Sequence, residues 1–190
     1  AETVMRGIND AAAANSVNLT ALAILSSEHH ALTREELLSQ LRVYQGLLKE
    51  VPYTQDVNVP TATAEELWSQ AKRTDKFTIN EDTMGQVIGL ENANAIAMTY
   101  YRNNILHLMI VPGIVATALV AKKQQTLTQL IEQVQQVYPM LQAELFLSHE
   151  VDEVPLWVEA IVEELQRQGL VSFSGGVYHM VSRESAQWLQ

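Results

Sequence analysis

Cysteine is missing from the 190-residue sequence altogether. Its absence excludes disulfide bonds, a thiol nucleophile and metal sites with cysteine ligands. A chain without cysteine is compatible with a cytosolic setting, where disulfide bonds are rare, although the absence does not by itself establish that setting.

Basic residues are scarce, and their distribution along the chain is uneven. The sequence has 12 Lys and Arg against 22 Asp and Glu, so its formal net charge is −10. Between residues 124 and 166 there is no Lys or Arg, whereas the same stretch carries eight Asp and Glu. Proteins that bind nucleic acid neutralise phosphates with clustered basic side chains. The charge pattern therefore argues against nucleic acid as a partner, and it predicts that the acidic stretch repels phosphate and anionic lipid.

No uninterrupted apolar stretch reaches the length of a typical membrane span. The longest, residues 105–121, has 17 residues and includes Pro112, whereas a transmembrane helix needs about 20 mostly apolar residues. We therefore expect a buried core helix, kinked or interrupted near Pro112 because proline removes a backbone donor and clashes with the preceding turn. The alternative, a membrane-spanning helix, predicts that the chain partitions into detergent.

A polar segment leads directly into this apolar stretch. On one continuous helix, Tyr100, Asn103, Asn104 and His107 would share about one third of the circumference, with Arg102 on the opposite side. Unpaired buried amides cost of order 1 to 3 kcal/mol, so a buried helix carries them only where partners exist. One interpretation is an internal hydrogen-bond network, and the other is a docking surface. Neither interpretation makes these five residues catalytic.

Helix signals are clear in the first half of the chain. A short apolar helix is expected at residues 18–26, with an extension back through residues 10–14 as an option. Thr33 and Glu36 are spaced as a capping box, and the apolar residues that follow recur every three or four positions, which predicts an amphipathic helix to about residue 50. Thr61 or Thr63 is expected to cap the next helix.

The second half repeats this kind of pattern. Residues 127–147 read as a long helix that Pro139 interrupts, and Pro155 stands near the first position of a further helix that stops at Gly169. Apolar runs on either side of short turn segments predict two β-hairpins, at residues 77–90 and 170–181.

Helices followed by a hairpin thus occur twice. The sequence predicts a mainly α fold with small β-hairpins, built as two winged-helix-like units joined by the central apolar helix. We expect one domain at residues 1–92 and a second at residues 93–190, which includes the central helix. The alternative is a single α-rich domain in which both hairpins are appendages.

Three segments carry a resemblance to a known family. The run MTYYRNNILHLMIVPGIVA, the segment INDAAAANSVNLTALAIL and the segment HALTREELLSQLRVYQGLLKEVPY resemble the C-terminal region of bacterial membrane-associated glycerol-3-phosphate 1-O-acyltransferases. The resemblance covers most of the chain from residue 8 to about residue 120. It implies a parent enzyme that transfers an acyl chain from acyl carrier protein or coenzyme A to the 1-position of glycerol 3-phosphate, at the cytoplasmic face of the inner membrane.

The catalytic signature of that family is missing from these residues. It is His-x-x-x-x-Asp, in which the histidine acts as base, and none of the five histidines here has an aspartate five positions later. A Glu-Gly-x-Arg-Ser block of the sort that holds glycerol phosphate is absent too. We therefore expect no catalytic, cofactor-binding or metal residues in this chain, and no activity from the chain alone.

Two functional hypotheses remain. The resemblance implies a non-catalytic C-terminal domain that supports or docks the upstream catalytic domain of the same polypeptide. In the parent enzyme, the partners are then the acyl thioester, glycerol 3-phosphate and the membrane. Under this hypothesis the residues Tyr100 to His107 form the docking surface. Without the resemblance, the pattern favours a stand-alone tandem winged-helix-like module that works through protein contacts.

Overall fold

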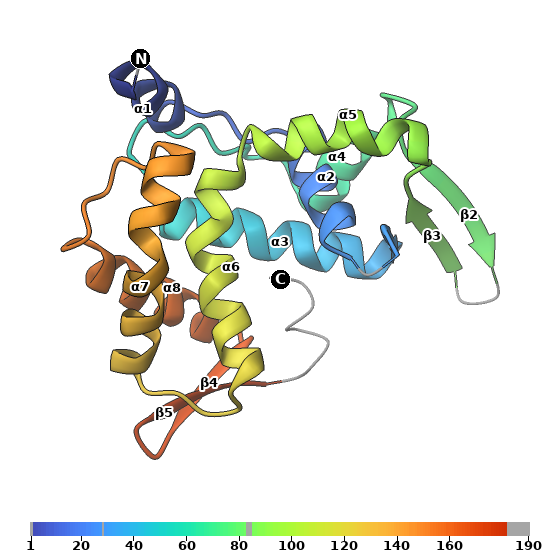
Figure 1. The fold of residues 1–190 in the computed structure, drawn as a ribbon. Coiled ribbons are helices and arrows are strands. Elements are labelled where there is room, and N and C mark those ends of the chain that lie inside the picture. The colour runs from blue at the N-terminus through green and yellow to red at the C-terminus, as the bar shows by residue number, and fades with distance from the viewer. Residues whose placement is uncertain (1, 28, 83–84, 182–190) are drawn as a thin grey trace. The chain divides into compact units, whose positions relative to one another are not determined.

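The computed structural model describes residues 2–27, 29–82 and 85–181, which form mostly helices and small antiparallel sheets (Figure 1). This confirms the coarse fold class expected from the sequence. The described residues fall into two compact units, each assembled from more than one stretch of the chain. Unit 1 combines Ala1–Ala12, Gly46–Val57 and His107–Gln190, and unit 2 combines Ala13–Gln45 and Asn58–Leu106.

Unit 2 is a helical layer with a three-stranded antiparallel sheet. Its elements are α2 (Ser16–Ser26), β1 (Ala31–Thr33), α3 (Arg34–Glu50), α4 (Ala64–Lys72), β2 (Thr78–Asp82), β3 (Gly85–Gly89) and α5 (Asn92–Asn103). The strand order is β1-β3-β2, so Ile88 of the central strand pairs with Leu32 on one side and Ile79 on the other. Ile88 is fully buried, and α2 packs against both α4 and α5. The last residues of α3, from Gly46 on, belong to unit 1.

Unit 1 contains the longer helices and a two-stranded hairpin. Its elements are α1 (Glu2–Asp10), α6 (Leu106–Ala121), α7 (Leu127–Leu145), α8 (Val154–Arg167), β4 (Val171–Ser174) and β5 (Val177–Met180). Helix α7 packs against α8, and α8 packs against β4. A single bridge between Gln125 and Tyr178 adds one residue to the free edge of β5.

Capping residues explain where several of the helices begin and end. Thr33, Thr63 and Thr126 each accept a hydrogen bond from the backbone three residues later, in complete capping boxes. Gly169 has φ of 76° after α8, and its N–H reaches Gln166 O while the next N–H reaches Leu165 O. That pair of bonds is a Schellman motif, which requires the left-handed backbone that glycine adopts without strain. The predicted start after Thr33 and the predicted stop at Gly169 are therefore confirmed, and of the two predicted caps, Thr61 and Thr63, the structure has Thr63.

The predicted interruptions at Pro112 and Pro139 and the predicted continuous central helix were wrong, whereas the alternative of a kink near Pro112 stays a prediction. Helix α6 runs without interruption through Pro112, and α7 runs through Pro139. Each proline removes one backbone bond, and the packing of the surrounding helix outweighs that loss. The actual break lies at residues 104–105, between α5 and α6, after two consecutive asparagines, which are weak helix formers. The extension of α2 back through residues 10–14 is also absent, because α2 starts at Ser16 behind an Asn15 cap.

Candidate functional site

The polar stripe predicted around residues 100–107 is divided by the helix break. Tyr100, Arg102 and Asn103 lie in α5, Asn104 ends that helix, and His107 lies in the first turn of α6, in the other unit. Tyr100 is 67% exposed and both asparagines are exposed, whereas His107 is buried. The five side chains therefore do not line one face of a single helix.

The exposed members of the stripe share a surface with an apolar residue that the sequence analysis did not single out. Ile96, one turn before Tyr100, is 80% exposed. We call Ile96, Tyr100, Asn103 and Asn104 the α5 face, because residues spaced by three and four positions lie on one side of a helix. The guanidinium of Arg102 donates to Asn103 Oδ1 at 3.0 and 3.2 Å. Whether the α5 face docks a partner stays a prediction.

His107, by contrast, is buried and belongs to an aromatic cluster within unit 1. Tyr53 is its centre: the ring is 2% exposed and meets the rings of His107, His149 and Trp157, at centroid distances of 5.4, 5.1 and 5.7 Å. The first two contacts are edge-to-face, the geometry that aromatic quadrupoles favour. We call Tyr53, His107, His149, Trp157 and Tyr138 the Tyr53 cluster; Tyr138 packs edge-on against Trp157.

Hydrogen bonds tie this cluster to the N-terminal stretch of the chain. Tyr53 Oη accepts from the backbone N–H of Ser148 at 2.5 Å, and Ser148 Oγ donates to Asp10 Oδ1 at 2.5 Å. Thr54 Oγ1 donates to the Asp10 carbonyl at 2.5 Å. Three stretches that lie far apart in sequence, around residues 10, 53 and 148, are thereby fixed to each other within unit 1.

Both histidines of the cluster use a ring nitrogen for a structural hydrogen bond. His107 Nε2 lies 3.1 Å from Asn9 O, and His149 Nε2 lies 2.7 Å from Tyr53 O. A carbonyl oxygen only accepts, so each Nε2 carries the proton and donates it. Burial lowers the pKa of His107, because the charged imidazolium is poorly solvated there.

The tyrosines of the cluster are held neutral for the same physical reason. Burial raises the pKa of Tyr53 and of Tyr138 above the ordinary value for a phenol. Tyr138 Oη donates to the His149 carbonyl at 2.8 Å. The two tyrosines are thus held neutral, and Nε2 of each histidine is engaged with a backbone carbonyl, which suits a packing role.

Metal binding and membrane insertion can also be examined in the part of the chain that the structure describes. No group of three or more His, Asp or Glu side chains is placed to hold a metal ion among residues 2–27, 29–82 and 85–181. In the same ranges no single helix is long and apolar enough to cross a membrane, and α5 with α6 reaches that length and composition only as a broken pair. Sequence reasoning missed the Tyr53 cluster, because its members are distant in the chain and follow no shared motif.

The fold and the cluster define a mainly helical region whose buried polar groups are structural. A family model described as the glycerol-3-phosphate acyltransferase C-terminal region matches residues 1–190, and the chain belongs to that family. A similar curated protein is the glycerol-3-phosphate acyltransferase of Aeromonas hydrophila, 44% identical over 176 residues, which are 93% of this chain and 22% of that protein. The chain thus spans less than a quarter of the length of this relative. No solved structure matches.

Proposed function

We propose that this chain is the non-catalytic C-terminal part of a glycerol-3-phosphate acyltransferase and that it supports and docks the catalytic part of the same polypeptide. The observation that carries the proposal is the match of the whole chain to a C-terminal family model, while 78% (100 − 22) of the relative lies outside the matching part. The absence of a His-x-x-x-x-Asp sequence from all 190 residues agrees with it.

The activity proposed for the parent follows from the family. The complete polypeptide transfers an acyl chain from acyl carrier protein or coenzyme A to the 1-position of glycerol 3-phosphate, at the cytoplasmic face of the inner membrane. None of the five histidines of the present chain has an aspartate five positions later, and His107 and His149 each use Nε2 for a backbone carbonyl, which supports a non-catalytic role. Its acidic stretch from residue 124 to 166 repels the anionic substrate and anionic lipid, so those ligands bind elsewhere.

The α5 face is the docking surface that we propose for the catalytic part. Ile96 and Tyr100 are large side chains left at 80% and 67% exposure, and tyrosine is among the residues enriched where proteins bind each other. Asn103 and Asn104 provide uncharged donors and acceptors beside them. A surface of this kind suits a partner with an apolar pocket and a polar rim.

The order of elements supports the finer prediction of two winged-helix-like units. In unit 2 the order is α2-β1-α3-α4-β2-β3 with strand order β1-β3-β2. In unit 1 the order is α6, the bridge residue Gln125, α7, α8, β4 and β5, and Gln125 pairs with β5 as β1 pairs with β3. In both cases a threonine capping box opens the helix that follows the first strand position.

This repeated order also favours the second candidate, a stand-alone tandem winged-helix-like module that works through protein contacts. The division into domains at residues 1–92 and 93–190 stays a prediction. An open reading frame that continues upstream into a His-x-x-x-x-Asp motif supports the acyltransferase proposal, and an initiator methionine close to residue 1 supports the stand-alone module.

The decisive experiment measures acyl transfer to glycerol 3-phosphate. The samples are the complete polypeptide, this chain alone, the upstream part alone, and the two parts mixed. We expect activity from the complete polypeptide, none from this chain, and recovery on mixing. Activity from the chain alone would overturn the proposal, because it would mean catalysis without the motif.

Variants of the complete polypeptide test the α5 face. Tyr100→Ala and the pair Asn103→Ala and Asn104→Ala should lower activity, and they should weaken recovery on mixing. Gln136→Ala, which removes an exposed amide from α7, is the matched control and should leave both unchanged. Equal activities for all variants would remove the α5 face from the docking surface.

A further inference from the structure

Helix α1 is amphipathic, yet its apolar side points outward. Val4, Met5 and Ile8 are 64%, 40% and 59% exposed, although they lie along one side of the helix. An amphipathic helix on the surface of a globular protein normally turns its apolar side to the core and its polar side to water. In α1 the arrangement is reversed.

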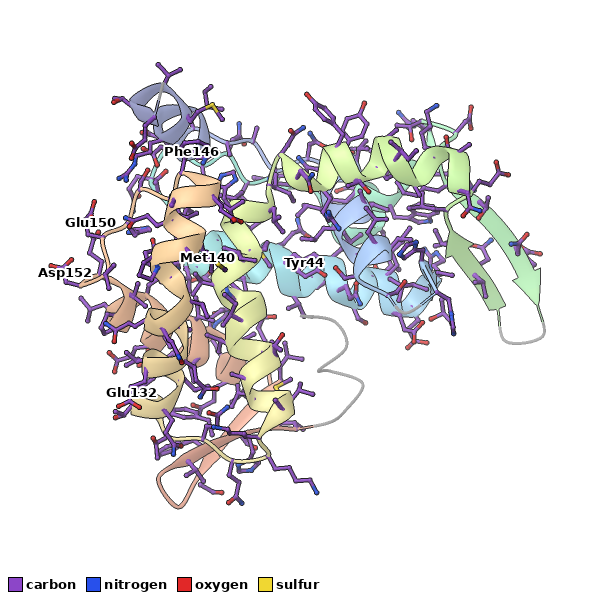
Figure 2. The ribbon with its side chains drawn as sticks, viewed as in Figure 1. Tyr44, Glu132, Met140, Phe146, Glu150 and Asp152 are labelled. Carbon is purple, nitrogen blue, oxygen red and sulfur yellow. The ribbon has the colours of Figure 1, made fainter. Side chains whose placement is uncertain are left out.

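The polar side of α1 makes the contacts with the rest of unit 1. Asn9 Nδ2 donates to the carbonyls of Leu145 and Phe146 at 2.7 and 3.3 Å, at the end of α7, which Phe146 marks in Figure 2. Asp10 accepts from Ser148 and from Thr54 through its carboxylate and its carbonyl.

The one basic residue of α1 is also directed to this side. Arg6 pairs with Glu2 at 3.0 Å and with Glu150 at 3.5 Å. Its Nε is buried. Asn9 also accepts, through its carbonyl, from His107 of the Tyr53 cluster. These bonds fix the rotation of α1 about its axis, so the outward direction of Val4, Met5 and Ile8 is imposed by the fold.

We propose that Val4, Met5 and Ile8 form a docking surface for the remainder of the acyltransferase polypeptide, separate from the α5 face. This rests on the proposed function above. The Aeromonas relative has 78% (100 − 22) of its length outside the part that matches this chain, so a large protein surface is present in such a polypeptide. We call these three side chains the α1 face.

Charge distinguishes this occupant from a lipid surface. Helices that lie in a membrane interface carry Lys and Arg on their polar side, where they meet anionic headgroups. The only basic side chain of α1 is Arg6, and two carboxylates already neutralise it. Glu2 and Glu150, which pair with Arg6 on the polar side of α1, stay 67% and 64% exposed and would repel anionic lipid.

Charge also disfavours a second copy of this chain. Two α1 faces in contact would bring the same acidic residues toward each other, in molecules that each carry a formal net charge of −10. The occupant that fits is an apolar protein surface with basic residues where it approaches the exposed Glu2 of α1.

Thiol labelling in the complete polypeptide tests the proposal, because this part of the chain has no cysteine of its own. The variants are Ile8→Cys and, as the matched control, Leu156→Cys, whose parent residue is an apolar side chain 73% exposed on α8. Each is treated with a maleimide in lipid-free detergent solution, and the modified peptide is quantified by mass spectrometry. Each rate is normalised to the rate of the same variant in urea.

We expect the normalised rate at position 8 to be at least about tenfold lower than at position 156, as for a covered site that reacts only on opening. Equal rates would overturn the proposal. So would protection that appears only with added phospholipid vesicles, which would identify lipid as the occupant, or protection lost on dilution, which would identify a second copy.

The labelling result is independent of the acyltransferase assay. If Ile8→Cys reacts without protection in a polypeptide whose activity still depends on this chain, the docking role of the α1 face is refuted, whereas the proposed function is not. An Ile8→Glu variant adds a second measurement, made in a Met5→Cys background: it should release the contact and raise the maleimide labelling of Met5→Cys. Thr3→Glu, which adds the same charge outside the α1 face, should not raise that labelling.

Discussion

Tyr53 offers the sharpest test of how unit 1 is held together. Its ring contacts His107, His149 and Trp157, and its hydroxyl accepts the backbone N–H of Ser148. Tyr53→Phe keeps the ring and removes only that acceptor. An unsatisfied, largely buried donor costs about 1–2 kcal/mol, which is the destabilisation that we expect for unit 1.

Tyr53→Ala removes the ring as well. Truncation of a buried aromatic side chain to alanine costs about 3–5 kcal/mol in well-packed cores, because the neighbours do not close the cavity. The alanine variant should therefore be clearly less stable than the phenylalanine variant. Tyr101→Phe is the control: Tyr101 lies in unit 2 and is 39% exposed, so its replacement should stay within about 0.5 kcal/mol of the parent.

Amide hydrogen exchange is the suitable assay, because a chain with two compact units need not unfold in one step. Exchange in α8 reports on unit 1, and exchange in α2 reports on unit 2. We expect the amides of α8 to exchange faster in both Tyr53 variants than in the parent, and faster in Tyr53→Ala than in Tyr53→Phe. The exchange rates in α2 should not change. Identical exchange in the parent and in Tyr53→Ala would refute the view that this residue joins the three segments of unit 1.

Three further predictions concern single positions. Burial lowers the pKa of His107 in the folded state. The contribution of the neutral imidazole to stability is therefore complete above the pKa of about 6.5 in the unfolded chain, and it is lost as the pH falls through the lower pKa of the folded state. The urea midpoint of the parent should fall between about pH 7 and pH 5, and His107→Gln should make that fall smaller. A variant with the same pH dependence as the parent would contradict this. Gly169→Ala should destabilise α8 by about 1 kcal/mol, measured by its urea midpoint, because alanine is strained at a φ of 76°. Thr126→Ala should cost about 1 kcal/mol and speed exchange in the first turn of α7, while the exposed Thr128→Ala should do neither.

Local chemistry in the sequence was enough to place most element ends. The capping box at Thr33, a helix cap at Thr61 or Thr63, the glycine stop at position 169 and both hairpins were predicted; the structure has the box at Thr33, the cap at Thr63, the stop and the paired strands. These features depend on residues three or four positions apart, so nearby sequence contains all the information needed. Strand β1 was missed, because three residues between two helices give too short a pattern to recognise.

The proline predictions failed for the opposite reason. A proline inside a helix loses one backbone bond, a local cost, while the decision to continue the helix depends on what packs around it. Pro112 is buried within α6, and Pro139 lies next to the buried Tyr138 in α7. The break at residues 104–105 then separated His107 from the other residues of the predicted stripe, which no calculation on an ideal helix would reveal.

The sequence by itself determined the family, through segments such as MTYYRNNILHLMIVPGIVA, and it determined the helical class and the missing catalytic motif. Those properties depend on residue identity and short spacing. Only the tertiary structure decided that Tyr53, His107 and His149 meet, and that α1 turns its apolar side outward. Contacts between segments as much as 138 residues apart depend on how the helices pack. The rotation of a helix about its axis depends on which of its sides finds hydrogen-bond partners.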